Sequence, residues 1–121
     1  MQGHTSTVWQ LDFSPCGLYI VSCSEDRSII IWHEGKALLK IADAHERSIY
    51  SVSWRDDLIA STGSDNQLKI FKINLESKSY SLLKEIDAHS EDVNCVMFSP
   101  VDPNLIATCS DDMDVKIWKL N

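Results

Sequence analysis

Residues 21–32, VSCSEDRSIIIW, decide the fold because the same pattern returns twice, as ASTGSDNQLKIF at 60–71 and as ATCSDDMDVKIW at 107–118. A segment headed by histidine precedes each copy: GHTSTVWQLDFSP at 3–15, AHERSIYSVSW at 44–54 and AHSEDVNCVMFSP at 88–100. The heads of these segments, His4, His45 and His89, lie 41 and 44 residues apart. A period of about 40–45 residues is that of a four-stranded propeller blade, so the sequence predicts three copies of one β-unit.

Each unit contains three apolar runs with the periodicity of strands. In the first run large apolar side chains occupy alternate positions, as in Trp9, Leu11 and Phe13. Second and third runs are predicted at 19–24 and 28–32, 58–63 and 67–71, and 105–110 and 114–118. A turn rich in Asp and Asn joins each of these pairs into a hairpin. Residues 37–41 and 80–86 supply a fourth strand to the first two units, whereas only residues 119–121 follow the last third strand.

The composition is that of an ordinary globular protein. The chain has 121 residues, of which 44% are hydrophobic and 24% charged, and this length suits one domain. The 11 basic and 18 acidic residues give a net charge of −7 at pH 7, which argues against nonspecific binding to nucleic acid or to an anionic membrane. No apolar run approaches the roughly 18–20 residues that span a bilayer. We therefore expect a soluble intracellular protein whose partners present a neutral or basic surface to it.

The four cysteines, Cys16, Cys23, Cys95 and Cys109, are scattered singly along the chain. They form no C-x-x-C pair, and no histidine stands at a metal-finger spacing from them. Tetrahedral metal sites need ligands that converge, so a structural role is favoured. Cys23 and Cys109 occupy matching positions in two apolar strands, where free cysteine behaves as a small buried hydrophobic residue. The sequence predicts neither a metal site nor a cofactor.

The Gly/Ala-His head, the Ser-x-Asp type of turn and the closing aromatic residue recur three times in register. By these motifs the chain resembles WD40-repeat proteins along essentially its whole length. The resemblance implies an all-β fold, a WD40 β-propeller fragment with three blades, two four-stranded and the last three-stranded. Within one partial propeller at 1–121, the repeats are expected at 3–43, 44–87 and 88–121. WD40 proteins commonly close a ring of seven blades, so the chain looks like the carboxy-terminal three blades of a longer propeller. The missing blades or self-association should then cover its open faces.

The resemblance also assigns a structural role to four residue types that repeat at fixed spacing. In WD40 proteins the corresponding side chains form a hydrogen-bonded tetrad: the carboxylate accepts from the imidazole, the imidazole from the hydroxyl, and the hydroxyl from the indole. The implied tetrads are His4, Ser22, Asp26 and Trp32; His45, Ser61, Asp65 and Phe71; and His89, Thr108, Asp112 and Trp118. Because Phe71 has no N–H, the middle tetrad should lack its last link and hold less tightly.

Serine, histidine and aspartate are also the residue types of a hydrolase triad. Catalysis would require an exposed nucleophile and an oxyanion hole. Here the same set recurs in all three units, the hydroxyl is a threonine in the third, and no G-x-S-x-G elbow is present. The sequence also lacks G-x-x-x-x-G-K-[ST], G-x-G-x-x-G and H-E-x-x-H. It therefore predicts a protein that is not an enzyme and has no catalytic residue.

A partner-binding face is implied on the end of the blades that carries the tetrad loops. Carried over from WD40 proteins position by position, it comprises Thr7, Trp9, Glu25, Ser48, Tyr50, Ser64, Asp92, Asn94 and Asp111. Aromatic residues dominate binding energies and carboxylates orient partners, so this mixture suits peptides or loops. In the alternative interpretation, Trp9 and Tyr50 pack between blades and the acids are solvated surface.

A closer resemblance to one group of WD40 proteins is found in five stretches of the sequence: 3–9, 22–27, 47–50, 88–96 and 108–112. These stretches are similar to the last three blades of the WD40 scaffold of the cytosolic iron–sulfur protein assembly machinery. That resemblance implies an adaptor in the cytoplasm, and also in the nucleus, whose partners are other subunits of the iron–sulfur targeting complex and apoprotein clients. It implies no cofactor, nucleic acid or membrane. The competing hypothesis is a generic WD40 peptide-binding module of a ubiquitin-ligase or signalling complex.

Overall fold

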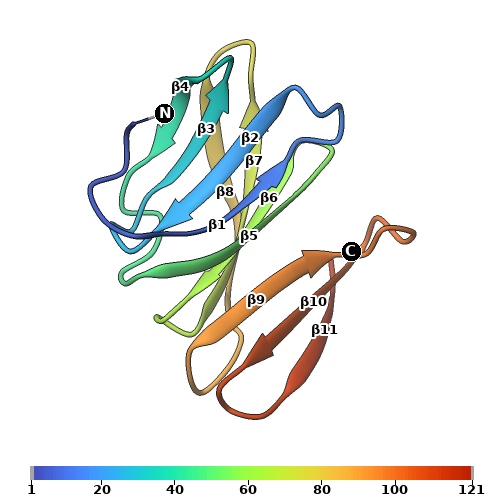
Figure 1. Ribbon diagram of the computed structural model, residues 1–121. Helices are drawn as coiled ribbons and strands as arrows, with labels where there is room; N and C mark the ends of the chain where they lie inside the picture. The colour runs from blue at the N-terminus through green and yellow to red at the C-terminus, as the bar shows by residue number, and fades with distance from the viewer. Residues whose placement is uncertain (1, 121) are drawn as a thin grey trace.

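Three antiparallel sheets, each packed against the next, make up the computed structural model, which describes residues 2–120 (Figure 1). The first sheet has the order β1 (Val8–Phe13), β2 (Tyr19–Ser24), β3 (Ile29–His33) and β4 (Lys36–Ile41). The second has β5 (Ile49–Arg55), β6 (Leu58–Gly63), β7 (Gln67–Asn74) and β8 (Ser79–Asp87). The third has β9 (Val93–Phe98), β10 (Leu105–Ser110) and β11 (Val115–Lys119). The predicted class, all-β with two four-stranded blades and one of three strands, is confirmed for the described residues.

Strand positions agree with the sequence pattern to within a few residues. The largest difference is in β7, which continues to Asn74 instead of ending at Phe71. It continues because β8 is also longer than predicted, and the two strands pair as far as Asn74 opposite Ser79. Residues 2–120 contain no helix that could cross a membrane.

The β2–β3, β6–β7 and β10–β11 turns share one conformation. In each, the residue after the tetrad aspartate has a left-handed backbone, with φ of 69° at Arg27, 67° at Asn66 and 74° at Met113. The aspartate carboxylate accepts a hydrogen bond from the backbone N–H two residues further on, at Ser28, Gln67 and Asp114. Such a side-chain bond replaces a backbone partner and holds the tight turn in place, which explains why aspartate stands at this position in all three blades.

The hydrophobic cores lie between blades. One core joins Val21, Cys23, Ile29 and Ile31 of the first sheet to Val52, Trp54, Ile59 and Phe71 of the second. A second core joins Ala60, Leu68 and Ile70 of the second sheet to Val96, Phe98 and Ile106 of the third. Each sheet thus buries its faces only against a neighbouring sheet, as expected for a repeat that cannot bury its apolar face alone.

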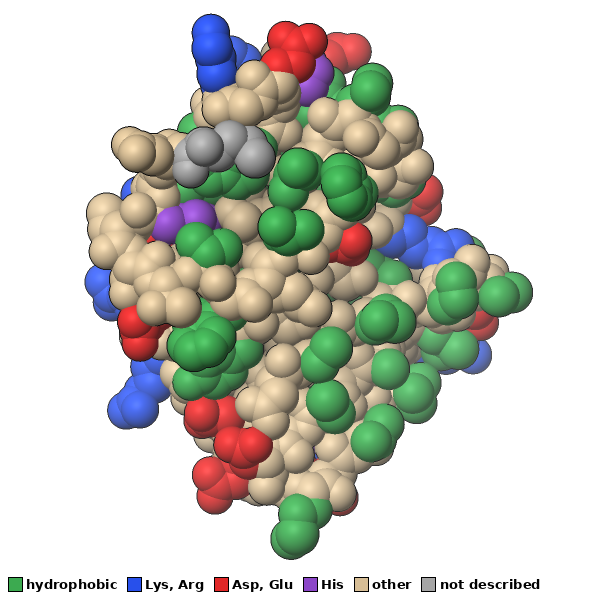
Figure 2. Space-filling view, in the orientation of Figure 1, with side chains coloured by type: hydrophobic (Ala, Val, Ile, Leu, Met, Phe, Trp, Pro, Cys, Tyr) green, Lys and Arg blue, Asp and Glu red, His purple; other side chains and the backbone are tan. Residues whose placement is uncertain are grey.

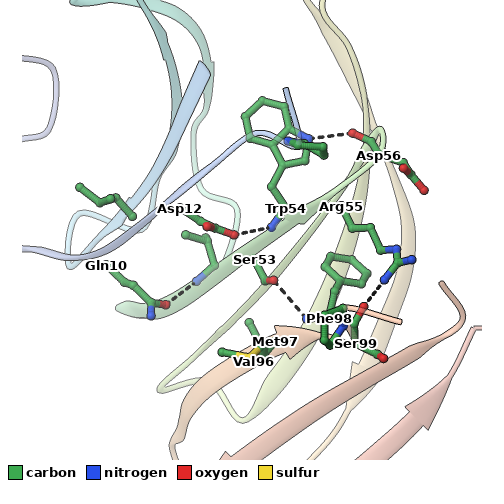
Figure 3. Close-up of a pocket in the computed structure, with 14 residues that line it drawn as sticks. Gln10, Asp12, Ser53, Trp54, Arg55, Asp56, Val96, Met97, Phe98 and Ser99 are labelled. Carbon is green, nitrogen blue, oxygen red and sulfur yellow. Dashed lines mark hydrogen bonds between the residues drawn. The ribbon is translucent and has the colours of Figure 1, made fainter. Parts of the chain in front are cut away.

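Hydrogen bonds also connect the inner strands β1, β5 and β9. Gln10 Oε1 accepts from the Val52 N–H at 3.1 Å, and Ser51 Oγ, in the equivalent position one blade later, accepts from the Val96 N–H at 3.0 Å. Two residues along, Asp12 accepts from the Trp54 N–H and Ser53 from the Phe98 N–H (Figure 3). These side chains satisfy backbone donors at strand edges, which would otherwise remain unpaired inside the junction.

Two apolar faces remain uncovered at the outer sheets. On the first sheet Leu11 and Phe13 are 55% and 56% exposed, although the equivalent Val52, Trp54, Val96 and Phe98 are buried. On the third sheet Val115 and Ile117 are 74% and 63% exposed, whereas the equivalent residues of β3 and β7 are buried. Figure 2 shows hydrophobic side chains spread along the side of the molecule that the β9–β11 sheet forms. Both faces are therefore surfaces on which another protein segment could pack.

Candidate partner-binding site

Polar networks fix the loops at one end of the first and third blades. In the first blade His4 Nδ1 lies 3.1 Å from Asp26 Oδ2, His4 Nε2 lies 2.6 Å from Ser22 Oγ, and the Trp32 indole donates to Ser22 at 2.8 Å. In the third blade the four matching residues form the same chain, with the Trp118 indole donating to Thr108 at 2.9 Å. Since a carboxylate only accepts, Nδ1 carries the proton and Nε2 accepts from the hydroxyl.

The middle blade has the same network without its last link. His45 Nδ1 lies 2.9 Å from Asp65 Oδ2, and His45 Nε2 lies 2.7 Å from Ser61 Oγ. At the position of the two tryptophans stands Phe71, which is buried in the core and contacts Tyr80 edge to face at 6.1 Å between ring centroids. The Ser61 hydroxyl therefore receives no indole N–H, in keeping with the sequence-based expectation for this residue.

The tetrad carboxylates are held in their ionised form. Burial disfavours the charge of Asp65, but hydrogen bonds from His45 and from the Gln67 and Glu46 N–H groups outweigh it and lower the pKa. The pKa of Asp112 is lowered to about 2, since the N–H groups of Asp114 and Ser90 and the His89 imidazole likewise outweigh burial. The pKa of Asp26 is also lowered, against burial, chiefly by the hydroxyl and N–H of Ser28 and by the Thr5 N–H.

These depressed pKa values predict how stability depends on pH. A carboxyl whose pKa is lower in the folded state adds stability above its unfolded pKa of 3.8 and loses it as the pH falls through the folded pKa. We expect the free energy of unfolding, measured by urea titration, to decrease between about pH 4 and pH 2. Asp112→Asn, which cannot ionise, should show a smaller decrease over the same range. An unchanged pH dependence in this variant would contradict the assignment.

A second prediction concerns the missing link in the middle blade. Because Phe71 lies in the same register as Trp32 and Trp118, an indole introduced by Phe71→Trp should donate to Ser61, and the half-exposed Tyr80 ring can move aside. We expect the free energy of unfolding to rise by about 1 kcal/mol. The measurement is urea unfolding, with amide-exchange NMR of the new indole N–H. If the larger ring overpacks the core, the free energy of unfolding falls instead. A less stable variant with a rapidly exchanging indole N–H would therefore refute the prediction.

A β-bulge presents one residue of the predicted face in each inner strand. The register of β1 against β2 passes from Val8 opposite Ser24 to Gln10 opposite Cys23, so Trp9 is the extra residue. The same shift makes Tyr50 the extra residue of β5 and Asn94 that of β9. Bulges are often found beside functional sites because they redirect a side chain. Alternating apolar and polar letters in the sequence do not reveal such a shift, so sequence reasoning missed it.

The other six residues of the predicted face form three equivalent pairs. The Glu25 N–H donates to the Thr7 carbonyl at 2.8 Å, the Ser64 N–H to Ser48 at 2.9 Å, and the Asp111 N–H to Asp92 at 3.1 Å. Each pair joins the loop before an inner strand to the turn that contains the tetrad aspartate. The structure therefore places all nine predicted residues at the same end of their blades, with the tetrads beneath holding both loops.

Five of these residues line one shared hollow: Trp9, Tyr50, Asp92, Asn94 and Asp111. The Trp9 and Tyr50 rings meet edge to face, with 5.5 Å between centroids and 85° between planes. Asn94 Nδ2 donates to Asp111 Oδ1 at 2.6 Å. The two aromatic residues do pack against each other across the blade junction, as the alternative interpretation expects, yet Trp9 remains 49% exposed. Side chains of all three blades thus meet at a surface that a partner can reach.

No metal-binding cluster of three or more His, Cys, Asp or Glu side chains exists among residues 2–120. Cys23 is buried, and burial raises the pKa of its thiol to about 12, which leaves it protonated and inert. A larger hollow of about 530 Å³ lies along the inner strands and is lined by residues such as Gln10, Asp12, Arg55 and Phe98 (Figure 3). Gln10, Asp12 and Ser53 are used in the bonds between blades described above, and Arg55 donates to the Ser99 carbonyl of the third blade. The aromatic and acidic hollow is therefore the stronger candidate for a partner site.

Comparison with known proteins gives the following similarities. The family model described as WD domain, G-beta repeat, matches residues 1–33, 36–72 and 80–119. The probable cytosolic iron-sulfur protein assembly protein Ciao1 of Aedes aegypti is 34% identical over 96% of the chain and 41% of its own length. Protein CIA1 of Arabidopsis thaliana is 44% identical over 69% of the chain and 26% of its own length. Protein hir1 of Schizosaccharomyces pombe is 30% identical over the whole chain but over only 15% of its own length.

Proposed function

Since the chain belongs to the WD40-repeat family, we propose that it is a non-catalytic scaffold of cytosolic iron–sulfur protein assembly, with repeats at 3–43, 44–87 and 88–121. The observation that carries the proposal is the similarity to the Aedes aegypti Ciao1 protein across 96% of the chain. The chain spans less than half the length of that relative. The partners of the full-length relatives, including any that bind outside the region matched by these three blades, are therefore part of the proposal.

A non-catalytic role is supported by the state of the hydroxyl groups. Ser22, Ser61 and Thr108 are buried, and each is hydrogen-bonded to a histidine of its own blade. A nucleophile must reach its substrate and have an oxyanion hole beside it. The same buried arrangement occurs three times, which suits a device that holds loops in place better than one reaction centre.

The proposed partners are proteins, namely other subunits of the iron–sulfur targeting complex and apoproteins that receive clusters. The exposed hollow formed by three blades supports protein binding at the tetrad end. The net charge of −7 opposes nucleic acid and anionic membranes as partners. The cytosol is the compartment that the names of the Ciao1 relatives suggest, and a nuclear location remains a prediction.

Affinity capture of the tagged protein from cytosol, followed by mass spectrometry, tests this function. We expect iron–sulfur assembly proteins to be enriched over a capture with the tag alone. Enrichment of ubiquitin-ligase or signalling subunits instead would support a generic WD40 peptide-binding module and refute the assembly role.

A separate experiment asks whether the thiols take part. If the protein acts as an adaptor, a folded variant in which Cys16, Cys23, Cys95 and Cys109 are all serine should capture the same partners. Stoichiometric iron in anaerobically purified wild-type protein, lost in this variant, would mean that the protein carries the cluster itself.

A further inference from the structure

We propose that the hollow lined by Trp9, Tyr50, Asp92, Asn94 and Asp111 binds a cationic side chain of a protein partner, with arginine preferred over lysine. The inference rests on the proposed scaffold function and adds to it the chemistry that a partner must present. The hollow, called here the cation pocket, combines two exposed elements: an aromatic wall and an acidic wall.

The aromatic wall is formed by Trp9 from β1 and Tyr50 from β5. Trp32, Trp54 and Trp118 each donate their indole N–H to an oxygen atom inside the molecule. The Trp9 indole makes no such bond within residues 2–120, and the side chain is half-exposed. A tryptophan face attracts cations more strongly than any other aromatic ring. This side chain is therefore available to a ligand in a way that the other three tryptophans are not.

The acidic wall carries charge that the described chain leaves unbalanced. Three surface carboxylates have cationic partners, Asp43 with Arg27, Asp57 with Lys72 and Glu85 with Lys69, whereas other exposed acids of the described chain, such as Glu34 and Glu76, form no ion pair. Within residues 2–120, neither Asp92 nor Asp111 forms an ion pair with a lysine or arginine. Figure 2 shows Asp and Glu side chains gathered at the lower left, over the β10–β11 turn and the start of β9, beside a group of hydrophobic side chains. A cation from a partner would meet both walls at this place.

The pocket is preorganised by the backbone. Trp9, Tyr50 and Asn94 are the extra residues of the three matching bulges. Asn94 holds the Asp111 carboxylate at 2.6 Å, and the Asp111 N–H is bonded to the Asp92 carbonyl at 3.1 Å. Groups fixed before binding lose less conformational entropy when the ligand arrives, so the cation is met by a site already in place.

Charge complementarity selects the ligand. An anionic side chain would be repelled by Asp92 and Asp111, and an apolar one would desolvate them without compensation. Arginine is favoured over lysine because its planar guanidinium stacks on an indole face and donates several hydrogen bonds to carboxylates at once. The protein's charge of −7 also steers a cationic segment toward it, an effect that salt reduces.

The test uses the whole 121-residue protein and an acetylated, amidated pentapeptide with one arginine between glycines. We expect the indole N–H signal of Trp9 to shift in ¹⁵N NMR spectra, with a Kd on the order of millimolar and weaker binding at high salt. The three other indole signals should stay in place. The same peptide with glutamate or leucine should cause no shift, and lysine should bind more weakly than arginine.

Variants separate the walls of the pocket. Trp9→Ala and the double variant Asp92→Asn/Asp111→Asn should each weaken arginine-peptide binding by about fivefold. The matched control Glu34→Gln/Glu76→Gln removes the same charge from turns at the opposite end of the blades and should bind normally. Equal weakening by the control, or equal shifts with the glutamate peptide, would overturn the proposal. Loss of iron–sulfur partners in affinity capture while the peptide still binds would instead refute the proposed function alone.

Discussion

Asp65→Ala should lower the free energy of unfolding by about 3 kcal/mol. The carboxylate accepts hydrogen bonds from His45 Nδ1 and from the backbone N–H groups of Glu46 and Gln67. The His45 side chain is 1% exposed, so water cannot replace the lost acceptor. Removing one partner of a buried bond costs the desolvation of the group left behind, and here three donors lose the same acceptor. The middle blade lies between the other two, so its loosening affects both cores.

Urea unfolding measures the effect, with Asp111→Ala as the matched control. Asp111 belongs to the equivalent turn of the third blade, but its exposed carboxylate bonds only to Asn94 among the described side chains. We expect this control to change the free energy of unfolding by less than about 0.5 kcal/mol. The two variants should also differ in binding: Asp111→Ala should lose affinity for the arginine peptide, whereas Asp65→Ala should lose stability. An Asp65→Ala protein with wild-type stability would show that the tetrad is not a structural device.

The isolated chain should associate head to tail through its two uncovered faces. Leu11 and Phe13 of the first blade correspond to residues that are buried at both internal junctions, and so do Val115 and Ile117 of the third blade. A second copy placed with its first blade against the third repeats the junction that the chain already forms twice. This contact lacks both kinds of internal hydrogen bond. Cys95 stands where Gln10 and Ser51 accept from the next blade, and Met97 stands where Asp12 and Ser53 do so. It should therefore be weaker than the internal junctions.

Light scattering on charged variants tests both the association and its direction. We expect wild-type protein to have at least twice the 13.7 kDa mass of one chain, and Leu11→Glu or Ile117→Glu alone to be monomeric. Both side chains are already exposed, so neither change should unfold the protein. A mixture of the two variants should form a one-to-one pair, since one intact face of each kind remains. A wild-type monomer with a sharp unfolding transition, or association abolished by only one of the two variants, would rule out the head-to-tail contact.

The repeat pattern predicted much of the fold because blades are local units. The hairpin between the second and third strands of each blade is formed by contiguous residues, and its turn depends on an aspartate that bonds to its own backbone two residues on. Likewise, the tetrad partners stand at fixed spacing within one unit. The resemblance to WD40 proteins, carried over position by position, implied the nine residues of the partner face, and five of them line the cation pocket.

The amino-acid sequence by itself determined the three β-units, their hairpins and the residues at their ends, since each depends on interactions within about 40 residues of chain. Tertiary structure alone decided which apolar faces are buried. Leu11 and Val52 follow the same alternating pattern, but only Val52 has a blade packed against it. It also decided that Trp9, Tyr50 and Asn94 point from bulges toward one hollow. Alternation indicates which side chains share a face, whereas burial and the meeting of blades depend on the neighbour that each face acquires.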